Sequence, residues 1–504
     1  MMTNFILAPI FIHMITAILL LFFWQKVKAQ KIISIIGNIV AFAASIMLFS
    51  AAQDNFLIVN AGGWEAPFGI TFVADSLSVI MVLLTSLVSL TVGIYSTVAL
   101  NISRIKFGYF FIFHFLIMGL MGVFLTGDIF NLYVWFEVVI ISSFVLLTLG
   151  GKKMQMEGAV KYVTMNMLAS VIFLTAIGIL YGITGTLNMA DLAVKITKVE
   201  NKGLVSVTAL LFFAGFGIKS AVFPLYFWLP SSYHTPPSAI AAIFGGLLTK
   251  MGIYAMIRVF TLIFRPDEFI LNVFIVIAIM TMITGALGTI NKRSIRRMMS
   301  YLIVCHIGYL IAGMGIYTEL AFVGLIFYLI HDMIVKSNLL MITGVIQKIR
   351  ETIDMQRLGG LYKDYPKLSL LIAIVLFSLV GIPPLSGFWP KIYLFSEAFK
   401  AGEYVLLGTI IFASFITLFV VARMWSEVFW KESPKPLTDE IDQFSKLNFM
   451  SKFALIFPIT ILTFVSLYIG FGAETIINLA SKTATELMNP SMYIDAVLNG
   501  NISK

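Results

Sequence analysis

Apolar residues fill the chain in runs of about 20, and short polar stretches separate one run from the next. A run of this length crosses the hydrocarbon core of a bilayer as an α-helix. The runs are continuously apolar, whereas the strands of a membrane barrel alternate apolar and polar positions. The pattern therefore predicts an all-α polytopic membrane protein with about fourteen transmembrane helices. The predicted spans are residues 4–24, 32–52, 72–100, 107–126, 129–149, 160–183, 204–230, 238–260, 269–289, 299–317, 320–346, 367–399, 403–428 and 453–473.

Composition agrees with this interpretation, because 60% of the 504 residues are hydrophobic and only 12% are charged. Such values lie outside the range of soluble proteins. The longest polar stretch, about 430–452, is too short to form a core of its own. We therefore expect a single membrane domain over residues 1–504. Its first run, Phe5–Trp24, follows no basic segment and is expected to be a membrane helix rather than a cleaved signal peptide.

Basic residues predict the orientation of these spans. Cytoplasmic loops of membrane proteins collect Lys and Arg, and here the basic residues gather in every second loop. This asymmetry places the N-terminus outside. The exception is the basic stretch 186–203, which falls outside and is predicted to be a short amphipathic segment at the membrane surface. Because loop placement explains the formal charge of +9 and no basic stretch interleaves with aromatic residues, we expect no nucleic-acid partner.

Two long spans are interrupted by proline at matching places. The span 204–230 contains Pro224 and Pro230, and the span 367–399 contains Pro383 and Pro384. Proline interrupts a helix, and an interruption within the bilayer survives only where protein or water covers it. The two breaks lie five spans apart, and an odd offset gives repeats of opposite topology. We therefore expect two inverted five-helix repeats with two broken helices. The repeats would cover residues 107–260 and 269–428, with flanking helices in 1–100 and 453–504.

Four lysines lie in the middle of apolar spans: Lys219, Lys250, Lys336 and Lys391. A lysine at this depth costs roughly 2.5–3.5 kcal/mol on insertion scales, so four of them call for a function. Every other Lys or Arg is expected in a loop or near a helix end. The carboxylate of Glu137 lies near the centre of the span 129–149, and Lys219 is its expected partner. Together these groups suggest a path along which charge moves inside the membrane.

Further titratable residues surround this path. Asp332 and Lys336 are four residues apart, share one helix face and are therefore expected to pair, whereas His331 should face elsewhere. His331 is a candidate relay residue. His234 lies in an inside connection and is a candidate entry point for protons. Asp75 is expected to cap the N-terminus of a helix.

The remaining histidines and the cysteine carry less information. His13, His114 and His306 are expected to be core residues. The single cysteine, Cys305, excludes a disulfide or a cysteine-ligated iron–sulfur cluster within the chain. The sequence contains no metal-ligand constellation, nucleophile triad or cofactor fingerprint, and so we expect neither a metal nor a cofactor.

The sequence resembles a known family of membrane proteins. It is similar to the antiporter-like subunits shared by Mrp-type multi-subunit cation/proton antiporters and the membrane arm of respiratory complex I, over roughly residues 70–430. Two stretches, 62–70 and 303–308, most resemble the D subunits of the Mrp branch. The motifs that carry the wider resemblance are the context of Glu137, Gly217-Ile218-Lys219-Ser220, 230–237, Thr249-Lys250-Met251-Gly252 and Gly381-Ile382-Pro383-Pro384-Leu385-Ser386-Gly387-Phe388.

The resemblance implies roles for the buried charges. Glu137 and Lys219 would form the first pair of a half-channel, Lys250 the central relay, and Lys391 the step toward the outer side. In the family a histidine bridges the centre, commonly four residues before a lysine. Here Asp332 holds that place and His331 lies one position earlier.

We therefore expect a proton-translocating subunit of a multi-subunit Na⁺/H⁺ antiporter in a bacterial cell membrane. Its partners would be other subunits, membrane lipid, H⁺ and Na⁺. The alternative is a proton-pumping membrane subunit of an NADH:quinone oxidoreductase or a membrane-bound hydrogenase. Such a subunit carries no redox centre itself, so the lack of cofactor motifs does not distinguish it from an antiporter subunit. A carrier of organic solutes fits the line of lysines poorly.

Overall fold

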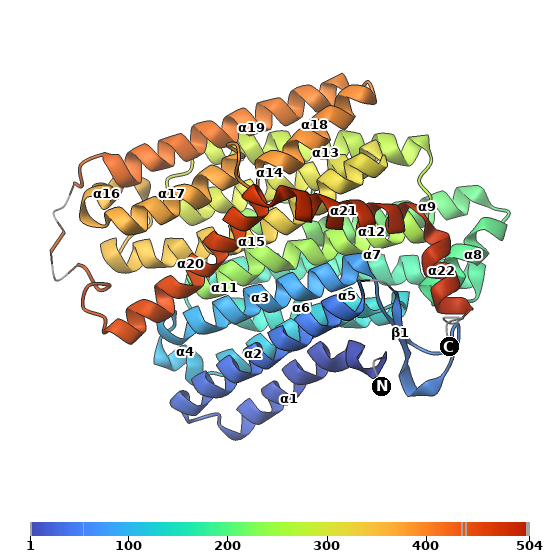
Figure 1. Ribbon diagram of the computed structural model, residues 1–504, viewed down its shortest axis with the longest axis horizontal. Helices are drawn as coiled ribbons and strands as arrows, with labels where there is room; N and C mark the ends of the chain where they lie inside the picture. Colours follow the sequence, from blue (N-terminus) through green and yellow to red (C-terminus); the bar gives the residue numbers. More distant parts are fainter. Residues whose placement is uncertain (1–2, 54, 435–436, 439–440, 500–504) are drawn as a thin grey trace.

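The computed structural model of the protein describes residues 3–53, 55–434, 437–438 and 441–499. Within the predicted polar stretch, residues 435–436 and 439–440 lie outside the described residues, as do residues 500–504 of the predicted C-terminal flank. The described chain is almost wholly helical, and its long helices run side by side along the longest axis (Figure 1).

Helices occupy all fourteen predicted spans within the described residues. Twelve are long and apolar enough to cross a membrane, and α5 and α17 are shorter apolar helices. The bounds are α1 Ala8–Phe22, α2 Val27–Ala51, α3 Ser76–Ala99, α5 Tyr109–Leu125, α6 Ile129–Thr148, α7 Lys153–Thr184, α9 Lys202–Ser220, α11 Ser238–Ile243 continued by α12 Thr249–Leu262, α13 Glu268–Ile290, α14 Ile295–Ile316, α15 Glu319–Arg350, α17 Pro366–Val380, α19 Tyr404–Trp425 and α20 Phe449–Phe471.

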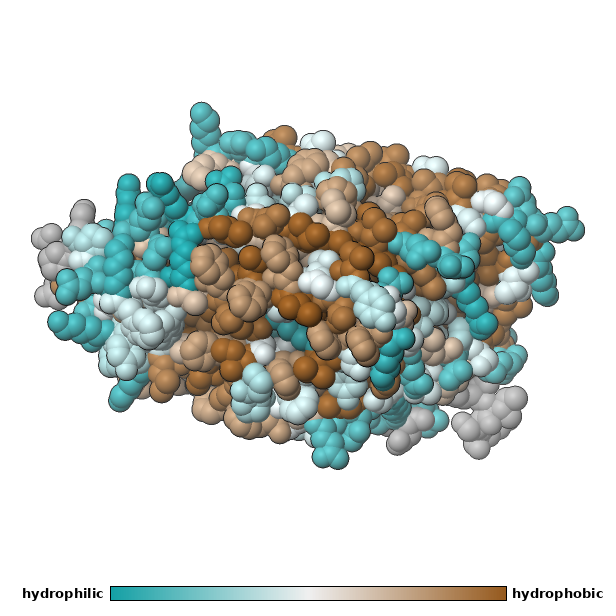
Figure 2. Space-filling model, turned by 90° about the horizontal axis from the view of Figure 1, so that it is seen from above, coloured by the Kyte–Doolittle hydropathy of each residue, from teal (hydrophilic) through white to brown (hydrophobic). Residues whose placement is uncertain are grey.

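On the face shown in Figure 2, apolar side chains cover much of the middle of the molecule and hydrophilic side chains gather toward its two ends. This distribution suits a protein whose sides face lipid and whose ends face water. Helix α15 is buried along most of its length. It packs against α3, α14, α20, α18 (Phe388–Lys400) and α21 (Ala473–Met488), and so it forms the centre of the bundle.

Two predicted spans contain helix ends. Helix α9 ends at Ser220, and the short helix α10, Trp228–Ser232, follows it. In the same way α17 ends at Val380, and α18, Phe388–Lys400, follows it. Pro224, Pro383 and Pro384 lie in the segments between these helices, whereas Pro230 lies within α10.

The residue after each of these helix ends adopts a left-handed conformation. Ala221 has φ 61° and Gly381 has φ 87°. Each donates its backbone N–H to the last turn, Ala221 to the carbonyl of Ile218 at 3.0 Å and Gly381 to that of Ser378 at 3.1 Å. These bonds close the helix C-termini, which would otherwise leave carbonyl groups without partners.

The predicted span 72–100 begins differently from the expectation. Strand β2, Thr71–Ala74, pairs antiparallel with β1, Leu57–Asn60, and helix α3 begins only at Ser76. Asp75 ends the strand and caps the helix, as predicted, because its carboxylate accepts the backbone N–H of Ser78 at 3.0 Å. The two strands form a small sheet at one end of an otherwise helical bundle (Figure 1).

Short elements complete the structure. The predicted amphipathic stretch 186–203 contains α8, Met189–Lys195, whose apolar side chains Leu192 and Ala193 are buried. The π-helical turn Phe244–Leu248 joins α11 to α12, and a second π-helical turn, Ser426–Trp430, continues α19 at its C-terminal end. The other short helices are α4 Ile102–Lys106, α16 Leu361–Asp364, α21 Ala473–Met488 and α22 Pro490–Leu498, with 3₁₀ turns at Thr3–Leu7, Ala61–Gly63, Ile196–Lys198 and Met355–Arg357.

Candidate functional site

Glu137 and Lys219 meet through a third side chain. Lys219 of α9 donates from Nζ to the hydroxyl of Ser170 at 3.1 Å, and Ser170 of α7 donates in turn to the carboxylate of Glu137 on α6. No direct ion pair joins Lys219 to Glu137 within the described chain. The predicted pair is therefore a three-membered chain of hydrogen bonds that links three helices.

The surroundings of this chain differ from one end to the other. Lys219 and Ser170 are buried, whereas Glu137 is half-buried at the side of the bundle. The ammonium group of Lys219 lies 4.9 Å from the ring centroid of Phe136, a distance at which the ring face attracts a cation. Lys219 also belongs to the last turn of α9, where the helix dipole favours positive charge.

Lys250 lies at the centre of the bundle in a fully buried ion pair. Its ammonium is 2.6 Å from Oδ2 of Asp332, and both side chains are inaccessible to solvent. Lys250 also donates to the carbonyl of Gly245 at 3.0 Å, a carbonyl within the π-helical turn that precedes α12. The second oxygen of Asp332 is 3.0 Å from Nδ1 of His306 on α14. The carboxylate therefore joins α12, α14 and α15.

The expected pairing of Asp332 with Lys336 is wrong. Both oxygens of Asp332 are engaged by Lys250 and His306, residues of two other helices. Lys336 is fully buried, and its Nζ has no hydrogen-bond partner in the described part of the chain. His306, expected to be an ordinary core residue, instead contacts the central carboxylate.

His331 faces away from Asp332, as expected, and toward the segment between α17 and α18. Its Nδ1 shares a hydrogen bond of 2.8 Å with the hydroxyl of Ser386. Ser386 lies 2.6 Å from the hydroxyl of Ser378 on α17 and 3.0 Å from that of Ser466 on α20. Three hydroxyl groups and an imidazole thus form one buried polar cluster.

Lys391 lies on α18 beside the same segment. Its Nζ donates to the carbonyl of Val380, at the C-terminus of α17, at 2.7 Å, and lies 5.5 Å from the ring centroid of Tyr309. A cavity of about 440 Å³ between α18 and α19 reaches this lysine. Lys391 is therefore buried but has a route to the surface of the chain.

His234 lies at the connection between α10 and α11 and does not touch the lysines. Its Nδ1 is 2.8 Å from the carbonyl of Pro230 and donates to it. Burial, together with the nearby Arg297, lowers the pKa of His234 below its usual value. His234 is thus a neutral imidazole near pH 7 with one nitrogen already engaged.

Sequence reasoning missed Ser170, because a serine within a membrane helix gives no signal of its own. It also missed the buried ion pair of Arg258 with Asp75, at 2.6 Å, because the sequence predicts Arg258 only as a residue near a helix end and Asp75 only as a helix cap. His13 and His114 are buried as expected, with their Nδ1 atoms 2.9 Å apart. Among the described residues, no three His, Cys, Asp or Glu side chains come close enough to hold a metal ion.

Comparison with known proteins identifies the family. Residues 126–417 match a family described as NADH:quinone oxidoreductase/Mrp antiporter. The chain is 40% identical to the D subunit of the Na⁺/H⁺ antiporter of Alkalihalophilus pseudofirmus, over 99% of this chain and 100% of that protein. It is 38% identical to the D subunit of the Na⁺/H⁺ antiporter of Bacillus subtilis, with the same coverage of both.

Solved structures agree. A chain of the Mrp complex from Dietzia sp. DQ12-45-1b superposes with a TM-score of 0.88 at 28% sequence identity, over 98% of both chains. A chain of an archaeal membrane-bound sulfane sulfur reductase shares the fold, with a TM-score of 0.89 at 24% identity over 98% of this chain and 100% of that one. The chain therefore belongs to the NADH:quinone oxidoreductase/Mrp antiporter family, and within it to the D subunits of Na⁺/H⁺ antiporters.

Proposed function

We propose that this chain is the D subunit of an Mrp-type Na⁺/H⁺ antiporter complex in a bacterial cell membrane, and that protons cross it along its buried lysines. It is a transporter subunit and not an enzyme, as its full-length similarity to the D subunits of two antiporters indicates. Its partners are the other subunits of the complex, since a chain of a solved Mrp complex has the same fold over nearly its whole length.

The observation that carries the proton path is the chain of hydrogen bonds from Lys219 through Ser170 to Glu137. When the ammonium of Lys219 gives a proton to the Ser170 hydroxyl, Ser170 releases its own proton to Glu137. The lysine becomes a neutral amine and the carboxylate a neutral acid, so one proton has moved and no charge is left unbalanced. A half-buried Glu137 can then exchange this proton at the side of the bundle.

The next steps run toward the centre and the outer side. While Lys219 is held by Ser170, it exchanges its proton only with Glu137; when that contact opens, a protonated Lys219 passes its proton toward Lys250. Lys250 holds its proton against Asp332, and Lys336 lies within electrostatic range of both Lys250 and Lys391. Lys336, free of a fixed partner in the described structure, bridges the two. His331 and the hydroxyl cluster around Ser386 line the approach to Lys391.

We further propose that residues 107–260 and 269–428 are two inverted repeats, with 1–100 and 453–504 as flanking helices. The broken helices support this proposal. In each, a left-handed residue closes the first half, Ala221 in one and Gly381 in the other. The second half then begins after the same number of residues, at Trp228 and at Phe388. Charge distribution in the loops supports an N-terminus outside.

The test uses the complete complex in everted membrane vesicles, with the pH change driven by added NaCl. Glu137→Gln and Lys219→Ala are expected to lower the initial rate about 100-fold, the typical contribution of a positioned proton donor or acceptor. The controls are Glu157→Gln and Lys161→Ala, which remove an exposed ion pair on α7. Normal transport by either relay variant, with the protein present in the membrane, would defeat the proposal.

A redox-linked pump is the second candidate, because the matched family includes NADH:quinone oxidoreductases. The purified complex separates the two candidates. An antiporter exchanges Na⁺ for H⁺ without oxidising NADH or hydrogen, and oxidation of either by the pure complex would favour the redox-linked pump.

A further inference from the structure

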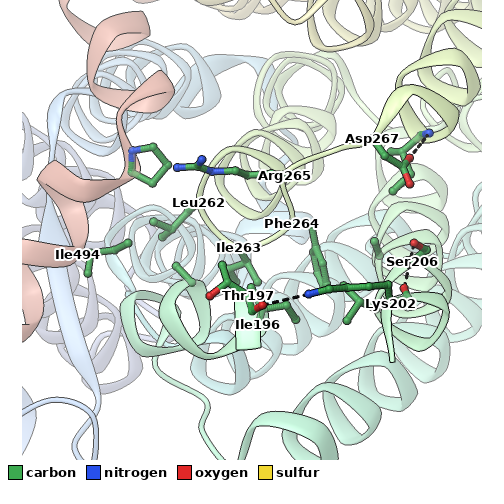
Figure 3. Close-up of a pocket in the computed structure, with 15 residues that line it drawn as sticks. Ile196, Thr197, Lys202, Ser206, Leu262, Ile263, Phe264, Arg265, Asp267 and Ile494 are labelled. Atoms are coloured by element: carbon green, nitrogen blue, oxygen red, sulfur yellow. Dashed lines mark hydrogen bonds between the residues drawn. The ribbon is translucent and has the colours of Figure 1, made fainter. Parts of the chain in front are cut away.

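A cavity of about 550 Å³ lies at one end of the bundle, where α8, α9, α22 and the connection between α12 and α13 meet (Figure 3). It shares no residue with the buried lysines described above. Helix α9 begins at Lys202, α12 ends at Leu262 and α13 begins at Glu268, so the cavity is built from the ends of three membrane-spanning helices. It therefore lies at the boundary between lipid and water.

The inner part of the cavity is apolar. Ala193 and Ile196 come from the segment between α7 and α9, Ala209 from α9, Leu262 from α12 and Ile270 from α13. Ala209 lies two turns of α9 inside Lys202, a depth of about 10 Å along the helix axis. The cavity thus extends from the helix ends to the level of the hydrocarbon.

Two cationic side chains lie at its mouth. Lys202 and Arg265 are exposed, and neither forms an ion pair within the described residues. Figure 3 shows Lys202 extending toward Thr197, whose carbonyl accepts from its Nζ at 3.0 Å, while Arg265 lies on the other side. Asp267 also lines the cavity, but its carboxylate accepts the backbone N–H of Ile270 at 2.9 Å and caps α13.

We propose that this cavity binds an anionic phospholipid. The phosphate lies between Lys202 and Arg265, and one acyl chain follows the apolar wall past Ala209. The two cations supply the charge that complements a phosphate, and the apolar depth supplies the surface that an acyl chain buries. The proposal also explains why the basic stretch 186–203 lies on the predicted outer side, where other lysines are sparse. It does not depend on the proton path.

A bound lipid would also touch the C-terminal helix. Pro490 and Ile494 of α22 line the cavity. The neighbouring Tyr493 places its ring centroid 5.1 Å from the guanidinium carbon of Arg258, which pairs with the buried Asp75. The lipid therefore fills the space between α22 and the ends of α9 and α12, and it holds α22 over this ion pair.

Native mass spectrometry of the purified complex tests the proposal, because one spectrum reports both bound lipid and the presence of every subunit. The probes are phosphatidylglycerol and phosphatidylcholine of equal chain length, added over a range of concentrations. The paired substitution Lys202→Gln with Arg265→Gln is expected to weaken phosphatidylglycerol binding about 30-fold, since each cation near a membrane surface adds about a factor of five.

Two further variants separate the headgroup from the acyl chain. Lys198→Gln, on an exposed lysine outside the cavity, is the charge control and should leave the affinity within about twofold. Val205→Phe, which narrows the cavity without changing its charge, should weaken binding of both lipids.

Three results would overturn the proposal. The first is equal affinity for the two lipids in the unaltered complex. The second is unchanged phosphatidylglycerol binding in the paired charge variant. The third is a cross-link to a partner subunit from a photoreactive amino acid placed at position 205, because a polypeptide would then fill the cavity in place of a lipid.

Discussion

The two charged sites on the proposed path differ in how their charges are balanced. At the first, Lys219 and Glu137 are separated by the hydroxyl of Ser170, and Glu137 is half-buried. At the second, Lys250 and Asp332 are in direct contact at 2.6 Å and fully buried. Opposite charges attract strongly in a dry interior and weakly near water. The first site can therefore open and close at small cost, whereas the second holds its ion pair as part of the core.

This difference assigns separate tasks to the two sites. A hydroxyl between two charged groups lets a proton pass and also lets the groups separate. A buried ion pair fixes the position of the central lysine, because a lone charge left at that place would be costly. Substitutions at the two sites test whether the direct ion pair supports the folded structure and whether the bridging hydroxyl supports transport.

The largest effect is expected from Asp332→Ala. The change leaves Lys250 as a buried cation without its carboxylate and removes the partner of His306. Breaking a buried pair in this way costs about 3–5 kcal/mol, and we expect both transport and the thermal stability of the complex to fall. Na⁺-driven proton movement measures transport, and the midpoint temperature of unfolding of the purified complex measures stability. Stability equal to that of the unaltered complex would show that the pair does not support the core.

The next effect is expected from Ser170→Ala. It removes the hydroxyl that joins Lys219 to Glu137, and hydrogen bonds to charged groups contribute about 1.5–3 kcal/mol, so we expect transport to fall about tenfold or more. Ser170→Thr keeps the hydroxyl and should retain transport. The alanine variant should also lose about 1.5–3 kcal/mol of stability, whereas the threonine variant should keep it. Equal transport by the alanine and threonine variants would show that the hydroxyl of Ser170 takes no part in proton movement.

A smaller effect is expected from Lys336→Met, which should raise the stability of the complex but lower its transport. The lysine is buried and has no hydrogen-bond partner in the described structure, so an apolar side chain of similar length should raise the stability of the complex by about 1 kcal/mol. Transport should nevertheless fall, because Lys336 is proposed to connect Lys250 with Lys391. Lys348→Met, close to the end of α15, is the control. A loss of stability would indicate that Lys336 has a fixed structural partner.

The smallest effect is expected from His234→Gln. Burial and the nearby Arg297 lower the pKa of His234, so the imidazole is already neutral across the range from pH 7 to pH 9. A neutral amide should therefore leave the pH profile of transport unchanged in that range. Below pH 6 the folded protein resists protonation of this histidine, and stability that depends on its neutral form falls as the pH decreases. A shifted profile above pH 7 would make His234 a proton entry point after all.

The sequence predicted the parts of the structure that follow from hydrophobicity alone. The helical spans, the burial of Lys219, Lys250 and Lys391, and the two proline segments could be located because each carries a local signal. Contacts between distant helices could not. Helical spacing predicts that Asp332 pairs with Lys336, but its two oxygens instead contact Lys250 and His306, which belong to two other helices. Ser170 stayed hidden because a serine in a membrane helix usually bonds only its own backbone.

The central claim is that the lysines form one route in series. The direct measurement is proton movement, reported by a pH-sensitive dye, in proteoliposomes that contain the complete complex and carry a Na⁺ gradient. Lys219→Ala, Lys250→Ala and Lys391→Ala are compared with Lys161→Ala, each after the composition of the complex has been checked. If the lysines act in series, each of the three buried-lysine variants, taken alone, falls to the rate of liposomes without protein, while Lys161→Ala transports normally. Substantial proton movement in any one of the three, with the complex intact, would contradict it.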